Sequence, residues 1–166
     1  MSDVHPGGPA AARRHTQRVV NVASVDAMRA LGASLAGVAE PGDILCLFGD
    51  LGAGKTQLAK GFGAGLGVTA TVNSPSFVLM SEYAGRLPFF HVDLYRLADD
   101  TDALGSGLIE ERQAEGVTII EWAERLGSTL PDSRLDVVID GAGEEPRTVT
   151  LRPADARHGR YLEAVR

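Results

Sequence analysis

The chain has little of what extracellular and membrane proteins require. It contains a single cysteine, Cys46, so no intrachain disulfide can form, which is compatible with a reducing cytoplasm. It has no apolar run of about 18 residues that could span a membrane, and its N-terminus lacks the apolar core of a secretion signal. We therefore expect a cytoplasmic protein that makes no membrane contact.

Basic residues are also scarce. Sixteen Lys and Arg stand against 22 Asp and Glu, and the net charge of −6 argues against a nucleic-acid-binding surface that covers the whole molecule. A length of 166 residues with 44% hydrophobic content suits one domain. Residues 1–18 hold Pro, Gly, Ala and Arg without periodicity, so we expect a disordered N-terminal tail before a single domain over residues 19–166.

The strongest motif is a glycine-rich loop. Residues 49–56, GDLGAGKT, fit the phosphate-loop pattern G-x-x-x-x-G-K-[ST] at every fixed position. An apolar strand is predicted before the loop, over residues 44–48, and a helix after it, over residues 57–66. In this setting backbone N–H groups and the helix dipole hold phosphate. Lys55 would bridge the β- and γ-phosphates, and the Thr56 hydroxyl would ligate Mg²⁺. The residues predicted to bind the nucleotide here are Asp50, Leu51, Gly52, Ala53, Gly54, Lys55, Thr56 and Gln57.

Two further strands are predicted to end in a carboxylate. The apolar runs 87–93 and 117–121 end in Asp93 and Glu121, and in an open α/β sheet the site lies at the carboxyl ends of the strands. One acid would hold Mg²⁺ and the other would orient or deprotonate the attacking water, and the residues leave open which does which. Trp122 directly follows Glu121, so both a core position and a site-facing ring are open for it. His91 shares a strand face with Asp93, and a structural role is favoured for it.

Other stretches complete an α/β pattern. Residues 19–22 form a predicted strand, Ser24 suits a helix N-cap, and residues 78–93 suggest a hairpin. Two more strands are expected near residues 135–139 and 148–151, followed by a closing helical stretch through Tyr161 to Val165. The Ser74-Pro75-Ser76-Phe77 loop, rich in hydroxyls, is either a phosphate or metal sensor or a plain turn.

Four motifs together resemble one protein family. The strings GDLGAGKT at 49–56, SPSF at 74–77, HVDLYR at 91–96 and IEW at 120–122 stand in the order and spacing typical of the TsaE (YjeE) family. The resemblance runs from about Val19 to Leu151. It implies a P-loop NTPase-type α/β domain of three layers, with a mixed, largely parallel central sheet flanked by helices.

The resemblance also implies a role and its residues. The family is the ATPase component of the bacterial machinery that makes threonylcarbamoyladenosine in tRNA, and its members work with the partner proteins TsaB and TsaD. TsaD transfers the threonylcarbamoyl group, and ATP hydrolysis by the family resets the complex between turnovers, so contact with tRNA is indirect. By this resemblance Lys55 and Thr56 hold triphosphate and Mg²⁺, Glu121 is the metal-associated glutamate, Asp93 is the motif aspartate, and Trp122 lies near the nucleotide.

Three positions depart from the family pattern. Ser76 stands where Thr is common, so a hydroxyl survives, and Gln57 stands where Thr commonly follows the loop. Met28 stands where Thr is frequent in the first helix, which weakens the case for a side-chain contact to the nucleotide from that segment.

Three other activities remain to be weighed. A GTPase would commonly read guanine with N-K-x-D, but the only lysines, Lys55 and Lys60, lack that context, so adenine is favoured. A small-molecule kinase would usually carry an arginine-rich lid, whereas residues 97–116 hold only Arg112. A nucleotide-gated binding subunit with incidental hydrolysis is the third. The sequence thus predicts Lys55, Asp93 and Glu121 as catalytic residues, Thr56 and Glu121 as metal ligands, and ATP with Mg²⁺ as cofactors.

Overall fold

The regular elements follow one another in an alternating α/β order. The computed structural model describes residues 17–50, 52–74, 80–95 and 111–165. The elements are β1 (Arg18–Val22), α2 (Val25–Ala36), β2 (Ile44–Phe48), α3 (Lys55–Gly65), β3 (Met80–Tyr83), β4 (Phe89–Asp93), η1 (Glu111–Glu115), β5 (Val117–Glu121), η2 (Ala123–Thr129), β6 (Leu135–Asp140), β7 (Arg147–Pro153) and η3 (Arg157–Ala164), where η denotes a 3₁₀ helix. None of the helices formed by these residues has both the length and the apolar content needed to cross a bilayer.

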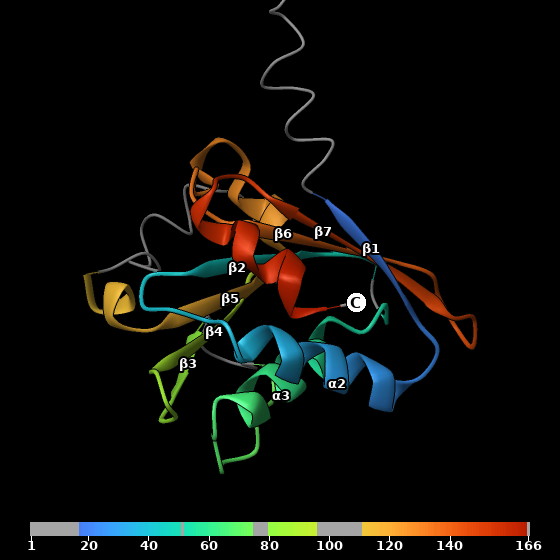
Figure 1. The fold of residues 1–166 in the computed structure, drawn as a ribbon, viewed down its shortest axis with the longest axis horizontal. Helices are drawn as coiled ribbons and strands as arrows, with labels where there is room; N and C mark the ends of the chain where they lie inside the picture. Colours follow the sequence, from blue (N-terminus) through green and yellow to red (C-terminus); the bar gives the residue numbers. More distant parts are fainter. Residues whose placement is uncertain (1–16, 51, 75–79, 96–110, 166) are drawn as a thin grey trace, which may run out of the picture.

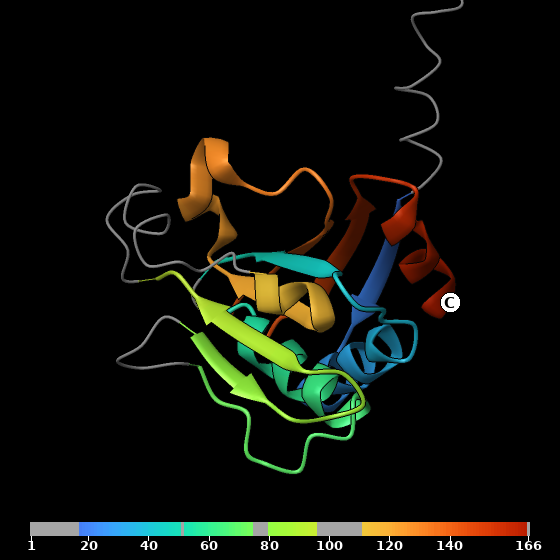
Figure 2. The same ribbon diagram turned by 90° about the vertical axis from the view of Figure 1, so that its left-hand side faces the viewer.

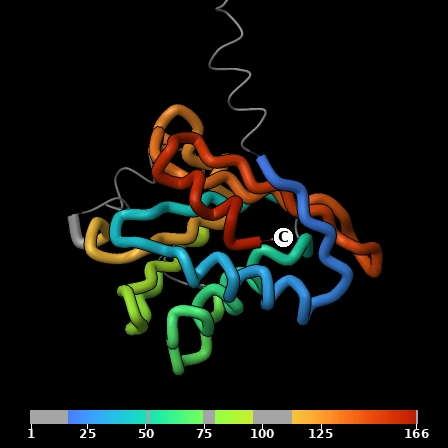
Figure 3. Tube along the Cα trace, viewed as in Figure 1, coloured from blue at the N-terminus to red at the C-terminus, as the bar shows by residue number. Residues whose placement is uncertain are grey.

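The strands form one mixed sheet. Their order is β1-β7-β6-β2-β5-β4-β3, and the central strands β6, β2, β5 and β4 are mutually parallel. Strand β7 is antiparallel to both β6 and β1, and β3 is antiparallel to β4, so five of the seven described strands run in the same direction. Figure 3 shows the first strand lying beside the late strand β7 at one edge. The predicted mixed, largely parallel sheet is confirmed.

Helices cover both faces of this sheet, as the three-layer prediction requires. Helices α2, α3 and η3 pack on one face, together with Leu45, Leu47 and Ile119 of the central strands (Figures 1 and 2). The opposite face carries Cys46 and Ile120 and is covered by the 3₁₀ turns of η2. Because side chains alternate along a strand, β2 and β5 contribute to both cores.

Most local predictions hold, with two corrections. Strands β2 and β5 have the predicted bounds, and the Ser24 hydroxyl accepts a hydrogen bond from Ala27 N at the start of α2. The helix after the loop, predicted over residues 57–66, is α3 (Lys55–Gly65) and begins two residues earlier than predicted. The closing helical stretch is a 3₁₀ helix. The part of the Ser74-Pro75-Ser76-Phe77 loop after Ser74 lies outside the described residues.

Glycines allow α2 and α3 to approach backbone to backbone. A Cβ added to Gly32 would lie 2.2 Å from the Leu58 carbonyl oxygen, and one added to Gly61 would lie 2.0 Å from the Arg29 carbonyl oxygen. No side chain can be accommodated at such separations, so glycine is required at both positions. Since Lys55 and Thr56 are the first residues of α3, this contact helps to fix where the phosphate loop lies on the sheet.

A buried carboxylate anchors the C-terminal helix at the other end of the central strands. Asp43, directly before β2, is fully buried and accepts hydrogen bonds from Tyr161 Oη at 2.6 Å and Arg157 Nε at 3.0 Å, as well as from Arg160. The hydroxyl bond and burial raise the pKa of Tyr161, with burial the larger cause. His158 Nε2 accepts from Ile44 N at 3.2 Å, so side chains of η3 bind both Asp43 and the start of β2.

The close contact between α2 and α3 predicts that a Gly to Ala change will lower stability, although the same change usually raises it in a helix. Gly to Ala in a helix interior ordinarily gains up to about 1 kcal/mol. At Gly61 the methyl group would force α2 and α3 apart, so we expect Gly61→Ala to destabilise the protein by about 1–3 kcal/mol or more. Thermal and urea unfolding would measure this. The matched control is Gly159→Ala in η3, where an added Cβ meets nothing within 4 Å. Equal stability of the two variants would contradict the assigned role of Gly61.

Candidate functional site

The phosphate loop joins the end of β2 to the first turn of α3. Gly52 and Gly54 have φ angles of +82° and +116°, which side-chain-bearing residues rarely adopt, and they curl the loop. Gly54 is the N-cap of α3 and has no side chain with which to cap it. The free N–H groups and the dipole of this helix therefore face the loop, an arrangement that suits an anion.

Lys55 is almost completely buried beneath the loop, with 5% of its surface exposed. Its Nζ donates to the carbonyl oxygens of Gly49 at 2.5 Å and Asp50 at 3.0 Å. The ammonium group also lies 4.1 Å from the centre of the Trp122 ring, a cation–π contact. Burial lowers the pKa of Lys55, while the nearby carboxylates of Glu121, Glu124, Asp93 and Asp50 oppose that shift.

Thr56 meets the acid at the end of β5. Its Oγ1 lies 3.2 Å from both carboxylate oxygens of Glu121 and 2.9 Å from the hydroxyl of Ser74. Glu121 is 2% exposed, and it lies on the sheet face that carries Val117 and Ile119, toward α2 and α3. Three segments of the chain thus bring hydroxyl and carboxylate oxygens to one place.

His91 supports Glu121 from the neighbouring strand. Its ring is fully buried, and Nε2 lies 2.6 Å from Glu121 Oε2, so Nε2–H donates to the carboxylate. Phe89 stacks on the imidazole with its ring centre 6.1 Å away. The Nδ1 atom has no hydrogen-bond partner in the described part of the chain. His91 therefore has a structural contact, as predicted, and that contact is made to a predicted site residue.

Asp93 lies next to Glu121 in the sheet. The two residues are register partners of β4 and β5, and Leu94 N donates to Glu121 O at 3.1 Å. Asp93 Oδ1 accepts from Tyr95 N at 2.9 Å, and its carboxylate also receives a hydrogen bond from Ser74. Burial, and then the charge of Glu121, raise the pKa of Asp93 against these hydrogen bonds.

Trp122 is half-buried at the rim of this site. With a φ of 59°, it is the single non-glycine residue of the described ranges whose φ is positive. Tyr95 packs beside it, with ring centres 5.0 Å apart. A left-handed backbone directly after Glu121 turns the chain sharply and leaves the indole against the Lys55 ammonium. Of the two positions that the sequence left open for Trp122, the structure shows the one in which the ring faces Lys55.

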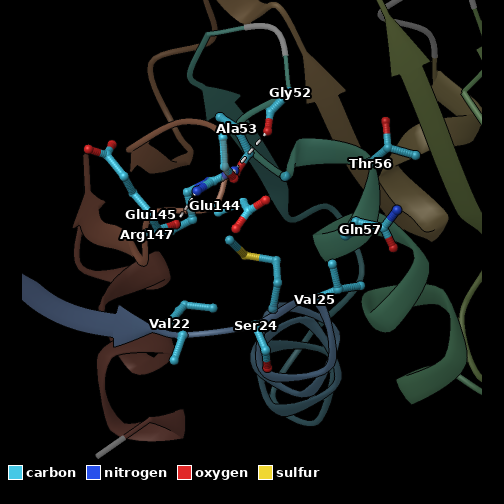
Figure 4. A pocket seen from close by; sticks show the side chains of 14 residues that line it. Val22, Ser24, Val25, Gly52, Ala53, Thr56, Gln57, Glu144, Glu145 and Arg147 are labelled. Atoms are coloured by element: carbon cyan, nitrogen blue, oxygen red, sulfur yellow. Dashed lines mark hydrogen bonds between the residues drawn. The ribbon is translucent and has the colours of Figure 1, made fainter.

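A cavity of about 470 Å³ adjoins the outer side of the phosphate loop. Its walls come from the β1–α2 turn, the loop itself and the hairpin between β6 and β7 (Figure 4). Val22, Val25 and Met28 supply the apolar part, and Glu144 and Arg147 lie on the hairpin side. This size and mixed lining suit a small organic ligand.

Most of the predicted site residues lie around this one region. Lys55, Thr56, Glu121 and Trp122 are linked by the contacts given above, and Asp93 adjoins them through Ser74 and Glu121. Gln57 accepts a hydrogen bond from Arg29 Nε at 2.8 Å and lines the cavity, whereas Leu51 lies outside the described residues. The remaining loop residues, Asp50, Gly52, Ala53 and Gly54, lie in the curl between β2 and α3.

Sequence reasoning missed one residue of the site. Arg147, the first residue of β7, donates from Nε to Ala53 O at 3.0 Å and from Nη2 to Gly52 O at 3.2 Å. It is 94 residues from Ala53 in the chain, and no local pattern marks it. Only the antiparallel return of β7 beside β6 brings it to the loop.

Comparisons with known proteins identify the family of this chain. Residues 22–149 match the family described as "Threonylcarbamoyl adenosine biosynthesis protein TsaE". The tRNA threonylcarbamoyladenosine biosynthesis protein TsaE of Bacillus subtilis (strain 168) is 44% identical over 149 residues, which cover 89% of this chain and 91% of that protein. The protein of the same name from Treponema pallidum (strain Nichols) is 38% identical over 112 residues, covering 68% and 83%. The crystal structure of Bacillus subtilis YdiB has a TM-score of 0.76 and 37% identity, covering 89% of this chain and 92% of that one. The chain therefore belongs to the TsaE family.

Proposed function

We propose that this protein is a Mg²⁺-dependent ATP-binding and ATP-hydrolysing subunit that acts in the cytoplasm. Its hydrolysis drives turnover of the complex that makes threonylcarbamoyladenosine in tRNA, with TsaB and TsaD as partner proteins and tRNA as an indirect partner. Relatives that are 38–44% identical over most of this chain carry names that place them in this biosynthesis.

The contact between Thr56 and Glu121 is the observation that carries the proposal. The hydroxyl of a phosphate-loop threonine lies 3.2 Å from both oxygens of a buried carboxylate, which ends β5, the strand that pairs in parallel with the loop strand β2. A glycine loop alone would suit many anions. A loop threonine paired with such an acid is the arrangement that P-loop NTPases use to hold Mg²⁺ against a triphosphate.

The donor set fits Mg²⁺. Thr56 and Glu121 offer hard oxygen ligands, and Ser74 adds a hydroxyl 2.9 Å from Thr56. Within the described ranges, no group of three or more His, Cys, Asp or Glu residues could hold a metal ion. This agrees with Mg²⁺, which is usually bound by one or two protein groups, water and substrate phosphates. When bound, the ion would neutralise charge on the phosphate oxygens, and Thr56 and Glu121 would hold it.

The nucleoside has a place beside the loop. The cavity of about 470 Å³ has apolar walls from Val22, Val25 and Met28 for a base, and it opens next to Gly54 and Thr56. Met28 stands where the family commonly has Thr, so its contribution is packing: a Cβ at Gly54 would lie 3.1 Å from Met28 Cε. The absence of an N-K-x-D motif favours adenine over guanine.

Glu121 and Asp93 have different surroundings, and we infer different roles from them. Both Glu121 oxygens contact Thr56, and one also contacts His91, so Glu121 is fixed toward the phosphate loop. Asp93 is held by Tyr95 N and Ser74 at the end of the next strand. We assign Glu121 to the metal and Asp93 to orienting the attacking water. Lys55 stabilises the charge that develops on the transferred phosphoryl group.

Partner dependence separates this proposal from its rival, a P-loop small-molecule kinase. The decisive experiment measures phosphate release from ATP by the purified chain alone, and then with TsaB, TsaD and tRNA. We expect slow hydrolysis alone and at least about tenfold stimulation by the partners, because charge stabilisation supplied in trans can raise turnover by orders of magnitude. Unchanged turnover with partners, together with phosphoryl transfer to a small acceptor, would establish the kinase instead.

Lys55 gives a direct test of nucleotide binding. Lys55→Ala should weaken ATP binding at least about tenfold by isothermal titration calorimetry, because a buried cation beneath the loop is lost. Lys60→Ala is the matched control, since it removes the only other lysine, from the same helix, and should change affinity less than about twofold. In the parent protein, fluorescence of Trp122, the sole tryptophan, should report ATP binding. Equal affinities of the two variants would refute the assignment of the loop.

Neutral isosteres test the two acids. Glu121→Gln and Asp93→Asn should each lower partner-stimulated hydrolysis by about 10²-fold or more, since each removes a charge at the reacting end of the nucleotide. Both variants should stay folded, because side-chain volume is kept. Glu163→Gln, an exposed change in η3, is the control. Hydrolysis at the parental rate in both site variants would show that these carboxylates do no chemistry.

A further inference from the structure

Arg147 joins two parts of the site that are far apart in the sequence. Its guanidinium donates to four main-chain carbonyl oxygens, two on the phosphate loop and two on the β6–β7 hairpin. The loop acceptors are Ala53 at 3.0 Å and Gly52 at 3.2 Å, and the hairpin acceptors are Gly143 at 3.0 Å and Glu145. Figure 4 shows the side chain reaching from the hairpin to the loop. One planar, rigid donor group therefore bridges both walls of the cavity.

These hydrogen bonds fix the direction of the loop peptides. In a trans peptide the carbonyl and the N–H of the next residue point in opposite directions. Because the Gly52 and Ala53 carbonyls point to Arg147, the N–H groups of Ala53 and Gly54 point away from it. Ala53 N accordingly donates to Asp50 O at 2.9 Å. The same oxygen accepts from Lys55 Nζ at 3.0 Å, so the N–H side of the loop is the side of the lysine.

Arg147 also brings a charge that the described residues leave unpaired. Across the described ranges its partners are all carbonyl oxygens, and no carboxylate there forms an ion pair with it. The side chain is half-buried beside the loop. Arg134, directly before the adjacent strand β6, contrasts with this, because its guanidinium is paired with Asp136 at 2.7 Å. Arg147 thus adds positive potential at a loop that already favours anions.

We propose that Arg147 is a positioning residue, which holds the phosphate-loop peptides with their N–H groups on the Lys55 side of the loop and couples the β6–β7 hairpin to the loop. This inference rests on the proposed function, since it concerns the same nucleotide site. Arginine is required, because lysine offers a point charge and cannot bridge two segments with a planar fork. Phosphate binding through the loop should therefore depend on Arg147 geometry as well as on its charge.

The test separates phosphate binding from nucleoside binding. Affinity for ADP and for tripolyphosphate, which carries no nucleoside, would be measured by calorimetry in the parent, Arg147→Gln and Arg147→Lys. We expect both variants to lose about five- to thirtyfold in affinity for both ligands, as for loss of one to two charge-assisted hydrogen bonds. Arg152→Gln, an exposed change on the same strand, should change neither.

Two other outcomes would overturn the positioning role of Arg147. If Arg147 only shapes the cavity wall, the variants will lose affinity for ADP and keep it for tripolyphosphate. If charge alone matters, Arg147→Lys will match the parent. Either result overturns the positioning role, and unfolding temperatures recorded without ligand keep loss of fold apart from loss of binding. Should Arg147→Gln fail to fold, Arg147→Lys carries the test. A parent that binds neither ligand would instead refute the proposed function.

Discussion

The contact between the Thr56 hydroxyl and the Glu121 carboxylate depends on the parallel pairing of β2 with β5. Leu47, near the end of β2, is the register partner of Glu121, so the acid ends its strand level with the start of the phosphate loop. Glu121 is in turn the register partner of Asp93. A shift of one residue in either pairing would turn these side chains to the opposite face of the sheet, away from α3. The two continuous apolar cores prevent such a shift, and the site therefore inherits its geometry from strand register.

The negative charges of Glu121 and Asp93 are partly offset by one nearby cation, the ammonium group of Lys55. Glu121 and Asp93 end adjacent strands, and two carboxylates so close repel each other unless a cation or hydrogen bonds intervene. Here Lys55, Thr56, His91 and the Tyr95 amide provide those interactions. Burial lowers the pKa of Lys55 and raises the pKa of Asp93, so each group is less stable in its charged form than in water. A bound phosphate and cation would relieve both conditions together, which is a physical reason for the pocket to favour a metal–nucleotide complex.

Short sequence patterns were enough to predict those strands and helix ends that depend on neighbouring residues alone. Strands β2 and β5 were predictable because short apolar runs end at a motif or an acid, and the cap at Ser24 follows from one hydroxyl before an apolar helical face. The close contact of α2 with α3 was not predictable, because Gly32 and Gly61 look like helix-weakening residues until the facing backbone is known. The Asp43 cluster and the reach of Arg147 join residues about 90 to 120 positions apart in the chain, and such contacts follow from topology. The sequence therefore pointed to side chains that the structure brings together, and it missed the contacts that orient them.

The hydrogen bonds of the loop carbonyls also suggest how nucleotide binding would proceed. The Gly49 and Asp50 carbonyls accept from the ammonium group of Lys55, whereas Gly52 and Ala53 accept from the planar guanidinium of Arg147. If a phosphate binds the Lys55 ammonium, the Gly49 and Asp50 carbonyls lose that donor. The Gly52 and Ala53 carbonyls keep theirs, because Arg147 lies on the opposite side of the peptides. Only the lysine side of the loop then has to rearrange. The energetic cost of opening the site is confined to two hydrogen bonds, each worth about 1 kcal/mol net and more when charged, and the new contacts to phosphate can offset it.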